Sequence, residues 1–302
     1  MLSDIIQNPQ YTTYRIPKKR GGWRAICAPQ GDLKEVQKRI NKWLKAYYQR
    51  IKPDCVFGFT CKPKNEVRYC NIVKNAEPHV GKRFVLNIDL ENFFPNISAR
   101  VILKLFRSKQ FNLDKGTAIG LTLLLTYQGK LPTGAPTSPV ISNFVCIPLD
   151  TALSDFSDQN KLTYTRYADD LTFSTDHPFT QDNISAICQL IRQHGFHINH
   201  RKFRIQSSFG RQTVTGIVVN RRVNVNRTRL KKIRAMIHDL KTNGLARAAA
   251  KHFNVQENDE RDVNFLFLKR LEGYINFVGQ VRGKEDMYYV KLKEDYILNK
   301  DK

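Results

Sequence analysis

The chain has 302 residues, of which 41% are hydrophobic, and this composition excludes a wholly disordered protein because a sizeable core can be buried. Its 50 lysines and arginines outnumber 27 aspartates and glutamates, which gives a formal net charge of +23. Such a charge attracts polyanions, so the sequence points to nucleic acid or to an anionic membrane surface as the partner.

The first part of the chain predicts a hairpin, helices and a buried strand. Residues 13–28 alternate around a Gly-Gly turn, as a β-hairpin does. Residues 33–51 carry apolar side chains at helical spacing. Residues 84–90 form a nearly continuous apolar run with an acid near its end, which is typical of a buried strand, and residues 98–128 are expected to be helical.

The second part predicts two further hairpins and three helical segments. Residues 162–175 alternate in the manner of two strands joined at an Ala-Asp-Asp turn, and a helical pattern follows over 183–194. Residues 214–219 and 222–226 are expected to pair as a short hairpin. From residue 227 an apolar stripe lies on an otherwise basic helix, and the last 40 residues are also predicted to be helical.

The positive charge is concentrated in two segments on either side of a more balanced middle. Residues 15–52 hold twelve lysines and arginines against two acids, and residues 201–251 hold fourteen against one. We therefore expect two basic arms that grip a nucleic-acid duplex around a central catalytic body. Binding would release counterions from the duplex, so the affinity should fall steeply as the salt concentration rises.

Membrane association and secretion are not favoured by the sequence. The longest apolar stretch, residues 118–127, is about half the length that spans a bilayer. The N-terminus lacks the basic and apolar regions of a secretory signal. The six cysteines form no C-x-x-C pair and are irregularly spaced, which indicates reduced thiols rather than a zinc site or disulfide framework. We expect a cytoplasmic protein without a membrane partner.

Three carboxylates stand at the ends of predicted strands. Asp169 and Asp170 lie between two strands with apolar and aromatic flanks, and Asp89 lies near the end of the buried strand. Adjacent charges in an apolar setting repel unless a cation neutralises them. If the strand lies beside the hairpin, the three acids form an oxygen site suited to Mg²⁺. Two such ions about 3.5–4 Å apart can activate a 3′-hydroxyl and stabilise leaving pyrophosphate.

Four segments, in this order along the chain, resemble the boxes of reverse transcriptases. They are Asp89-Leu90-Glu91-Asn92-Phe93-Phe94, the loop 131–139 with its P-x-G-x-x-x-S-P pattern, Tyr167-Ala168-Asp169-Asp170 as Y-x-D-D, and the G-x-x-x-N-x-x-K segment 195–202. Two more segments resemble those of retron reverse transcriptases in particular: Asn75-Ala76-Glu77-Pro78-His79 as N-A-x-x-H, and Val214-Thr215-Gly216 as V-T-G.

The resemblance implies an α+β fold with the right-hand architecture of polymerases. It would comprise an antiparallel palm sheet and a helical thumb. The expected division is fingers over 1–83, a catalytic palm over 84–212, and a primer-grip hairpin with an RNA-binding thumb over 213–302.

The resemblance also implies roles for individual residues. Two Mg²⁺ ions would be held by Asp89, Leu90, Asp169 and Asp170. Lys202 would donate a proton to the leaving pyrophosphate, neutralise it, or contact only a backbone phosphate. The incoming dNTP would be contacted by Lys18, Lys19, Arg24, Phe94 and Gly134. Phe94 would be the gate that excludes a 2′-hydroxyl, with Phe93 as the alternative gate, and Gly134 would let backbone approach the template base closely.

Other implied residues concern the primer, the template and the retron segments. Tyr167, Thr215 and Gly216 would lie at the primer and template, while Asn75, His79 and Val214 carry the retron resemblance. The implied reaction starts at the 2′-hydroxyl of an internal guanosine in a cognate noncoding RNA (msr-msd) and gives a branched RNA–DNA product (msDNA). No room is seen for a fused RNase H or effector, so host RNase H and a separately encoded effector in anti-phage defence are expected.

Three alternatives stay open at this point. The chain could be a group II intron-like or diversity-generating reverse transcriptase, or a non-catalytic RNA-binding module on a polymerase fold. The intact acids Asp89, Asp169 and Asp170 argue against the module.

Overall fold

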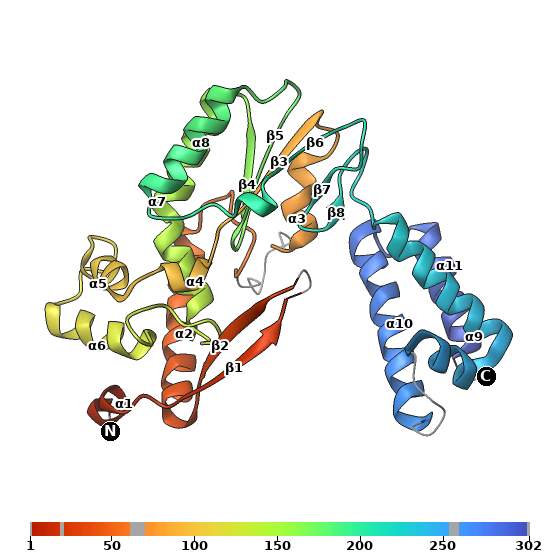
Figure 1. The fold of residues 1–302 in the computed structure, drawn as a ribbon, viewed down its shortest axis with the longest axis horizontal. Coiled ribbons are helices and arrows are strands. Elements are labelled where there is room, and N and C mark those ends of the chain that lie inside the picture. The colour runs from red at the N-terminus through yellow and green to blue at the C-terminus, as the bar shows by residue number, and fades with distance from the viewer. Residues whose placement is uncertain (1, 19–20, 61–69, 254–259, 301–302) are drawn as a thin grey trace. The chain divides into compact units, whose positions relative to one another are not determined.

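The computed structural model describes residues 2–18, 21–60, 70–253 and 260–300. It consists of two compact units, one formed by Met1–Asn75 with Arg83–Ser207 and the other by Ala76–Lys82 with Ser208–Lys302 (Figure 1). The combination of helices with antiparallel sheets confirms the expected α+β class.

The first unit is built on a four-stranded antiparallel sheet with the strand order β4-β5-β3-β6. Its strands are β3 (Phe84–Asp89), β4 (Thr163–Tyr167), β5 (Asp170–Thr175) and β6 (Arg204–Ser207). β3 is central, and its Val85, Leu86 and Ile88 are buried, which explains the nearly continuous apolar run in the sequence. The predicted strands around the Ala-Asp-Asp turn are confirmed as β4 and β5.

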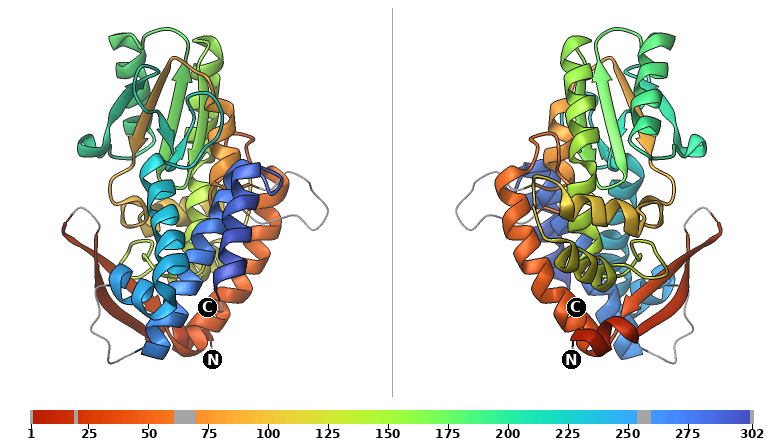
Figure 2. Two further views of the ribbon diagram at one scale, coloured as in Figure 1. Left: turned by 90° about the vertical axis from the view of Figure 1, so that its right-hand side faces the viewer. Right: turned by 90° about the vertical axis from the view of Figure 1, so that its left-hand side faces the viewer.

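Helix α7 (Ser138–Gln159) is the main support of the sheet, although the sequence pattern did not single it out. Eleven of its residues are buried, on several sides, so it lacks the amphipathic stripe by which surface helices are detected. It packs against β4, against α2 (Gly31–Ile51) and against α8 (Gln181–Gln193), as the two side views also show (Figure 2).

The remaining elements of the first unit are short. They are α1 (Leu2–Gln7), α3 (Ile72–Ala76, whose last residue already belongs to the second unit), α4 (Phe93–Asn96), α5 (Ala99–Arg107), α6 (Lys115–Leu125), the 3₁₀ turn η2 (His200–Lys202), and the predicted hairpin of β1 (Tyr11–Pro17) with β2 (Trp23–Pro29). The helical prediction over 98–128 is confirmed for residues 99–107 and 115–125, which form two separate helices. Ser98 and Asp114 each cap a separate helix by accepting a backbone N–H, so the chain makes two helices there.

Among its described residues, the second unit has a short 3₁₀ turn, a small hairpin and three α-helices. These are η1 (Glu77–His79), β7 (Thr213–Val214), β8 (Ile217–Val218), α9 (Arg227–Phe253), α10 (Glu260–Arg282) and α11 (Met287–Asn299). The apolar stripe predicted from residue 227 is buried at Ile233, Ile237 and Leu240. α9 is kinked at Gly244, where φ is 74°.

The predicted pairing of 214–219 with 222–226 was wrong in its position. Thr215 and Gly216 both have positive φ and form a two-residue turn inside the first of these segments, which pairs β7 with β8. The second segment contributes a single bridge, between Asn224 and Val218. Within the described residues, none of the helices is both long enough and apolar enough to cross a bilayer.

Candidate active site

The structure brings the three acids together at one end of the four-stranded sheet. Asp89 is the last residue of β3 and pairs in register with Asp170, the first residue of β5. The backbone N–H of Leu90 donates to the carbonyl of Asp169 at 3.0 Å. Paired residues on neighbouring antiparallel strands lie within about 5.5 Å between Cα atoms, so Asp89 and Asp170 are neighbours, and Asp169 adjoins them in the turn.

A two-residue turn contains Asp169 and leads directly into Asp170. Tyr167 and Asp170 are paired across β4 and β5, which leaves Ala168 and Asp169 as the loop. Ala168 has a φ of 59°, a conformation that favours glycine and is uncommon for residues with a side chain. The turn therefore needs support from its surroundings to keep this geometry.

The electrostatics of the site favour a cation. Desolvation and then the charge of Asp89 raise the pKa of Asp169, while Arg24 and Lys202 act in the opposite direction. Desolvation, followed by the charges of Asp169 and Asp89, raises the pKa of Asp170 to about 6, even though this residue is exposed at the surface. The acids thus repel one another and lack full compensation by protein cations.

Asp89 is held by the segment that follows α8. The ammonium of Lys202 lies 2.5 Å from Oδ1 of Asp89, and the side-chain amide of Asn199 donates to Oδ2 at 3.2 Å. The backbone N–H of Asn199 also donates to the carbonyl of Asp89 at 2.8 Å. Asn199 was not among the predicted site residues, although it is the Asn of the G-x-x-x-N-x-x-K segment.

The donor set fits Mg²⁺, which prefers carboxylate oxygens. Within the part of the chain that the structure describes, no three His, Cys, Asp or Glu side chains are gathered closely enough to form a ready ligand cluster. The ammonium of Lys202 forms an ion pair with the Asp89 carboxylate and so supplies one positive charge there. A metal ion would therefore share or displace this contact when it binds.

The two candidate gate residues differ in their surroundings. Phe93 is buried and stacks on Phe196, with ring centroids 5.8 Å apart, as a core residue does. Phe94 is only partly buried and stacks on Phe59 at 5.8 Å. The exposure favours Phe94 over Phe93 as the side chain that a nucleotide can reach.

The predicted nucleotide-binding residues of the hairpin differ in how well they are placed. Arg24 is exposed on β2 and lies close enough to Asp169 to lower its pKa. Lys18 is exposed at the end of β1, and its backbone N–H donates to Gly22 across the turn. Lys19 lies outside the described residues.

Gly134 packs closely against strand β2. Its φ is 120°, and a Cβ added there would lie 2.8 Å from Cγ2 of Ile26 and 3.1 Å from the carbonyl oxygen of Cys27. The N–H of Cys27 also donates to the carbonyl of Thr133 at 2.7 Å. The close approach seen at Gly134 is thus to the β1–β2 hairpin, and its role toward a template base stays a prediction.

The residues of the two retron segments are divided between the units. Asn75 is buried in the first unit, whereas His79 is buried in the second, and burial lowers the pKa of His79 to about 3, which keeps the ring neutral. Val214 is a buried residue of β7, and Thr215 and Gly216 form the turn after it. The roles of Thr215 and Gly216 at a primer stay predictions.

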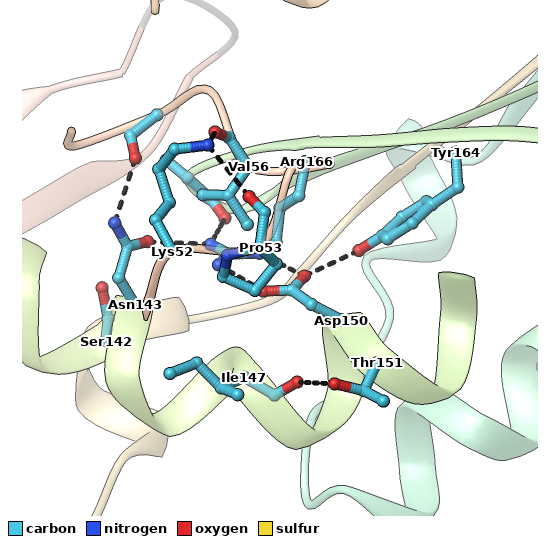
Figure 3. A network of polar contacts seen from close by, with 12 residues as sticks. Lys52, Pro53, Val56, Ser142, Asn143, Ile147, Asp150, Thr151, Tyr164 and Arg166 are labelled. Atoms are coloured by element: carbon cyan, nitrogen blue, oxygen red, sulfur yellow. Dashed lines mark hydrogen bonds and ion pairs between the residues drawn. The ribbon is translucent and has the colours of Figure 1, made fainter. Parts of the chain in front are cut away.

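A buried polar network behind the turn between β4 and β5 was missed by the sequence reasoning. Arg166 on β4 is fully buried and contacts Asp150 and Asn143, both on α7 (Figure 3). Asn143 in turn donates to the carbonyl of Gly58 at 3.1 Å. The available signal was an arginine inside an apolar strand directly before the turn, because a charge in that position needs a buried partner.

The raised pKa of Asp170 predicts a pH-dependent gain in stability for Asp170→Asn. Because the folded-state pKa of about 6 lies above the ordinary 3.8, ionisation works against folding as the pH rises through this range. In EDTA at pH 7.5 the variant should therefore melt roughly 2 °C higher than the parent protein. The difference should shrink at pH 5 and on addition of Mg²⁺ at pH 7.5.

This expectation is checked by thermal unfolding of the two proteins across the pH range, with Asp158→Asn as the control. Asp158 is exposed, so its replacement should leave the melting temperature nearly unchanged. A lower melting temperature for Asp170→Asn at pH 7.5 would contradict the repulsion among the acids.

Comparison with known proteins places the chain in a family. The family model described as reverse transcriptase (RNA-dependent DNA polymerase) matches residues 16–266. The chain is 36% identical over 238 residues to the retron Ec86 reverse transcriptase of Escherichia coli, covering 76% of this chain and 70% of that protein. It is 34% identical over 250 residues to the retron Mx65 reverse transcriptase of Myxococcus xanthus, covering 76% of this chain but only 55% of that protein.

Among solved structures, the telomerase of Candida albicans in complex with the TWJ fragment of telomeric RNA aligns with a TM-score of 0.55 at 13% identity. The alignment covers 99% of this chain and 62% of the telomerase, and it supports a polymerase fold of the expected type. The family model and the retron relatives agree with the family that the four boxes predicted. The chain therefore belongs to the reverse transcriptases and, among them, to the retron reverse transcriptases.

Proposed function

We propose that this chain is an RNA-directed DNA polymerase that copies part of a cognate noncoding RNA, msr-msd. The observation that carries the proposal is the register of Asp89 with Asp170 at the end of the sheet. The side chains of Lys202 and Asn199 donate hydrogen bonds to the Asp89 carboxylate. The retron relatives support the finer proposal that synthesis starts at the 2′-hydroxyl of an internal guanosine. The product would then be a branched RNA–DNA molecule, msDNA.

The side chains of the site divide the work of nucleotide addition. Asp89, Asp169 and Asp170, with Leu90 beside them, would hold two Mg²⁺ ions, which activate the attacking hydroxyl and stabilise the leaving pyrophosphate when bound. Arg24 would bind the triphosphate in a bidentate manner, which its exposure on β2 near Asp169 supports, and Lys18 and Lys19 are the other candidates. Lys202, which contacts Asp89, would donate a proton to the leaving pyrophosphate or neutralise it.

The proposed division of labour follows the expected fingers (1–83), palm (84–212) and thumb (213–302). The helices of the second unit support RNA binding because cations of α9 lie over aromatic rings of α10, as Arg229 does over Phe277 at 4.8 Å and Lys232 over Tyr274 at 5.7 Å. Such surfaces combine phosphate contacts with planar groups. The net charge of +23 supports the same partner.

The wider setting of the reaction is also part of the proposal. Copied template would be removed by a host RNase H in the cytoplasm, and the branched product would act with a separately encoded effector in anti-phage defence. These partners are proposed from the kinship with retron enzymes.

The direct test is to express the chain with its native flanking DNA and to separate the extracted nucleic acid on a denaturing gel. A discrete small DNA should appear for the parent protein and be absent for the double variant Asp169→Asn with Asp170→Asn. Its mobility should change after RNase or debranching treatment. Unbranched DNA would favour a group II intron-like or diversity-generating enzyme, and copurified RNA without any DNA would favour a non-catalytic module.

Phe94 gives a prediction about sugar selection. Phe94→Val should admit ribonucleotides, lowering the preference for dNTP over rNTP by about tenfold or more, because the ring excludes the 2′-hydroxyl by steric clash. Single-nucleotide extension with matched dNTP and rNTP measures the ratio. Phe93→Leu is the control, since this buried side chain should affect stability and leave the ratio unchanged. An unchanged ratio in Phe94→Val would remove Phe94 as the gate.

A further inference from the structure

Arg166 uses its whole guanidinium in one buried network. Its Nε and Nη2 each donate to one carboxylate oxygen of Asp150 at 2.7 Å, which makes a bidentate pair. Its Nη1 donates to the side-chain oxygen of Asn143 at 3.0 Å and to the carbonyl of Ala168 at 3.1 Å. Figure 3 shows these contacts, and the side chains of Arg166 and Asp150 are both fully buried. The guanidinium therefore links helix α7 directly to the turn that carries Asp169 and Asp170.

The anchoring side of this network is rigid. Asp150 and Asn143 lie seven residues apart on α7, which is two helical turns, so they face the same direction. Asp150 also accepts a hydrogen bond from the hydroxyl of Tyr164 at 3.0 Å. Burial alone lowers the pKa of a guanidinium, but the charge of Asp150 keeps the pKa of Arg166 above its ordinary value.

The backbone group that accepts the hydrogen bond from Arg166 lies in the strained part of the turn. The Ala168 carbonyl belongs to the peptide that joins Ala168 to Asp169, so a hydrogen bond to it fixes the orientation of the backbone from which the Asp169 side chain projects. Ala168 has a φ of 59°, which a residue with a side chain keeps only when its surroundings enforce it. Arg166 supplies a fixed donor at this point.

A contribution to stability alone is a weak explanation for such a pair. Well-packed apolar residues often replace a buried ion pair without loss of stability, because both charges must be desolvated. A planar guanidinium, however, can hold Asp150 with one edge and the Ala168 carbonyl with another, which a lysine ammonium does not reproduce.

We propose that Arg166, oriented by Asp150 and Asn143, is a positioning residue that sets the geometry of the turn bearing Asp169 and Asp170. The inference rests on the polymerase function proposed above. Arg166 touches neither substrate nor metal ion in this proposal and acts through the carbonyl of Ala168.

The test compares Arg166→Lys with Tyr164→Phe. Arg166→Lys keeps a positive charge near Asp150 but cannot contact Asp150 and the Ala168 carbonyl at the same time. Tyr164→Phe removes a different hydrogen bond to Asp150 and leaves the hydrogen bond from Arg166 to Ala168 intact. In primer extension on an RNA template, Arg166→Lys should lower kcat about 100-fold, as expected for a misplacement near 1 Å, with KM for dNTP changed less than about twofold. Tyr164→Phe should keep kcat within about threefold even where it lowers the melting temperature to a similar extent.

A second measurement follows the turn without any catalysis. Hydrogen–deuterium exchange of peptides covering 163–172 should be faster in Arg166→Lys than in the parent protein, and unchanged in Tyr164→Phe. If Arg166→Lys does not fold, Asn143→Ala takes its place, because it removes a neutral partner of the guanidinium. Its kcat should fall about tenfold, with faster exchange over the same peptides.

The outcomes separate the two proposals. A parent protein that does not extend a primer on RNA overturns the polymerase function, and the exchange data then still decide whether Arg166 orders the turn. An active parent with normal kcat and normal exchange in Arg166→Lys overturns the positioning role alone. Equal losses of kcat in Arg166→Lys and Tyr164→Phe at matched stability would also overturn it, because both changes would then act through the fold.

Discussion

DNA synthesis is expected to fall by at least about a thousandfold when Asp169 and Asp170 are both replaced by asparagine, because the site then loses two of its three charged oxygen ligands. The register of Asp170 with Asp89 and the hydrogen bond from Leu90 to the carbonyl of Asp169 bring the three acids to the same end of the sheet. Asparagine keeps the size of each side chain. The loss therefore reports on charge rather than on packing.

The measurement is extension of a labelled DNA or RNA primer on an RNA template, with binding of the same template followed by fluorescence anisotropy. Binding should be retained, since the replaced acids repel phosphate and the basic surface is untouched. Asp158→Asn, an exposed acid at the end of α7, is the matched control and should keep full activity. Extension by the double variant at more than a tenth of the parent rate would remove these acids from the reaction.

The three acids of the candidate site were easier to predict from the sequence than the residues that hold them in place. Asp89, Asp169 and Asp170 stand at strand ends next to apolar runs, and such acids can be recognised from local sequence because burying a charge without compensation is costly. Their convergence depends on which strands pair, and the apolar run of β3 was consistent with the central position that it takes between β5 and β6. The residues that hold the acids in place were not evident in this way.

The supporting residues were missed for a physical reason. Helix α7 has no single apolar face, so its periodicity gives no clear helical signal, and its buried Asn143 and Asp150 look like surface residues in the sequence. Their partner Arg166 lies far from them along the chain, and sequence periodicity does not report on such contacts. The division of the helical region 98–128 into α5 and α6 was a different case, because the caps at Ser98 and Asp114 are local features of the sequence.

Gly58→Ala is expected to have the second large effect, although it adds only one methyl group far from the acids in sequence. A Cβ at position 58 would lie 2.4 Å from the backbone nitrogen of Ala168 and 2.9 Å from the carbonyl carbon of Tyr167. These are backbone atoms of the turn between β4 and β5, so a side-chain rotation cannot relieve the clash. The segment around Gly58 is itself fixed, because Phe57 donates to the carbonyl of Arg166 at 2.9 Å.

The clash must therefore displace the turn, the segment that packs on it, or both. A displacement near 1 Å at catalytic carboxylates should lower kcat about 100-fold. Overpacking by one methyl should cost about 1–3 kcal/mol of the free energy of unfolding. The carbonyl of Gly58 also accepts a hydrogen bond from Asn143, so the same shift would disturb the network that orients Arg166.

Primer extension and thermal unfolding of Gly58→Ala, compared with Gly120→Ala, separate the clash from the general effect of adding a methyl group. Gly120 lies inside α6, and a Cβ there meets nothing within 4 Å. This control should be stabilised by up to about 1 kcal/mol, since alanine favours helix over glycine, and should keep normal kcat. If Gly58→Ala retains both kcat and melting temperature, the close packing of residue 58 against Ala168 is not what holds the turn between β4 and β5. A fall in kcat that exceeds the loss of stability would instead show that the position of the turn, rather than the fold as a whole, limits the reaction.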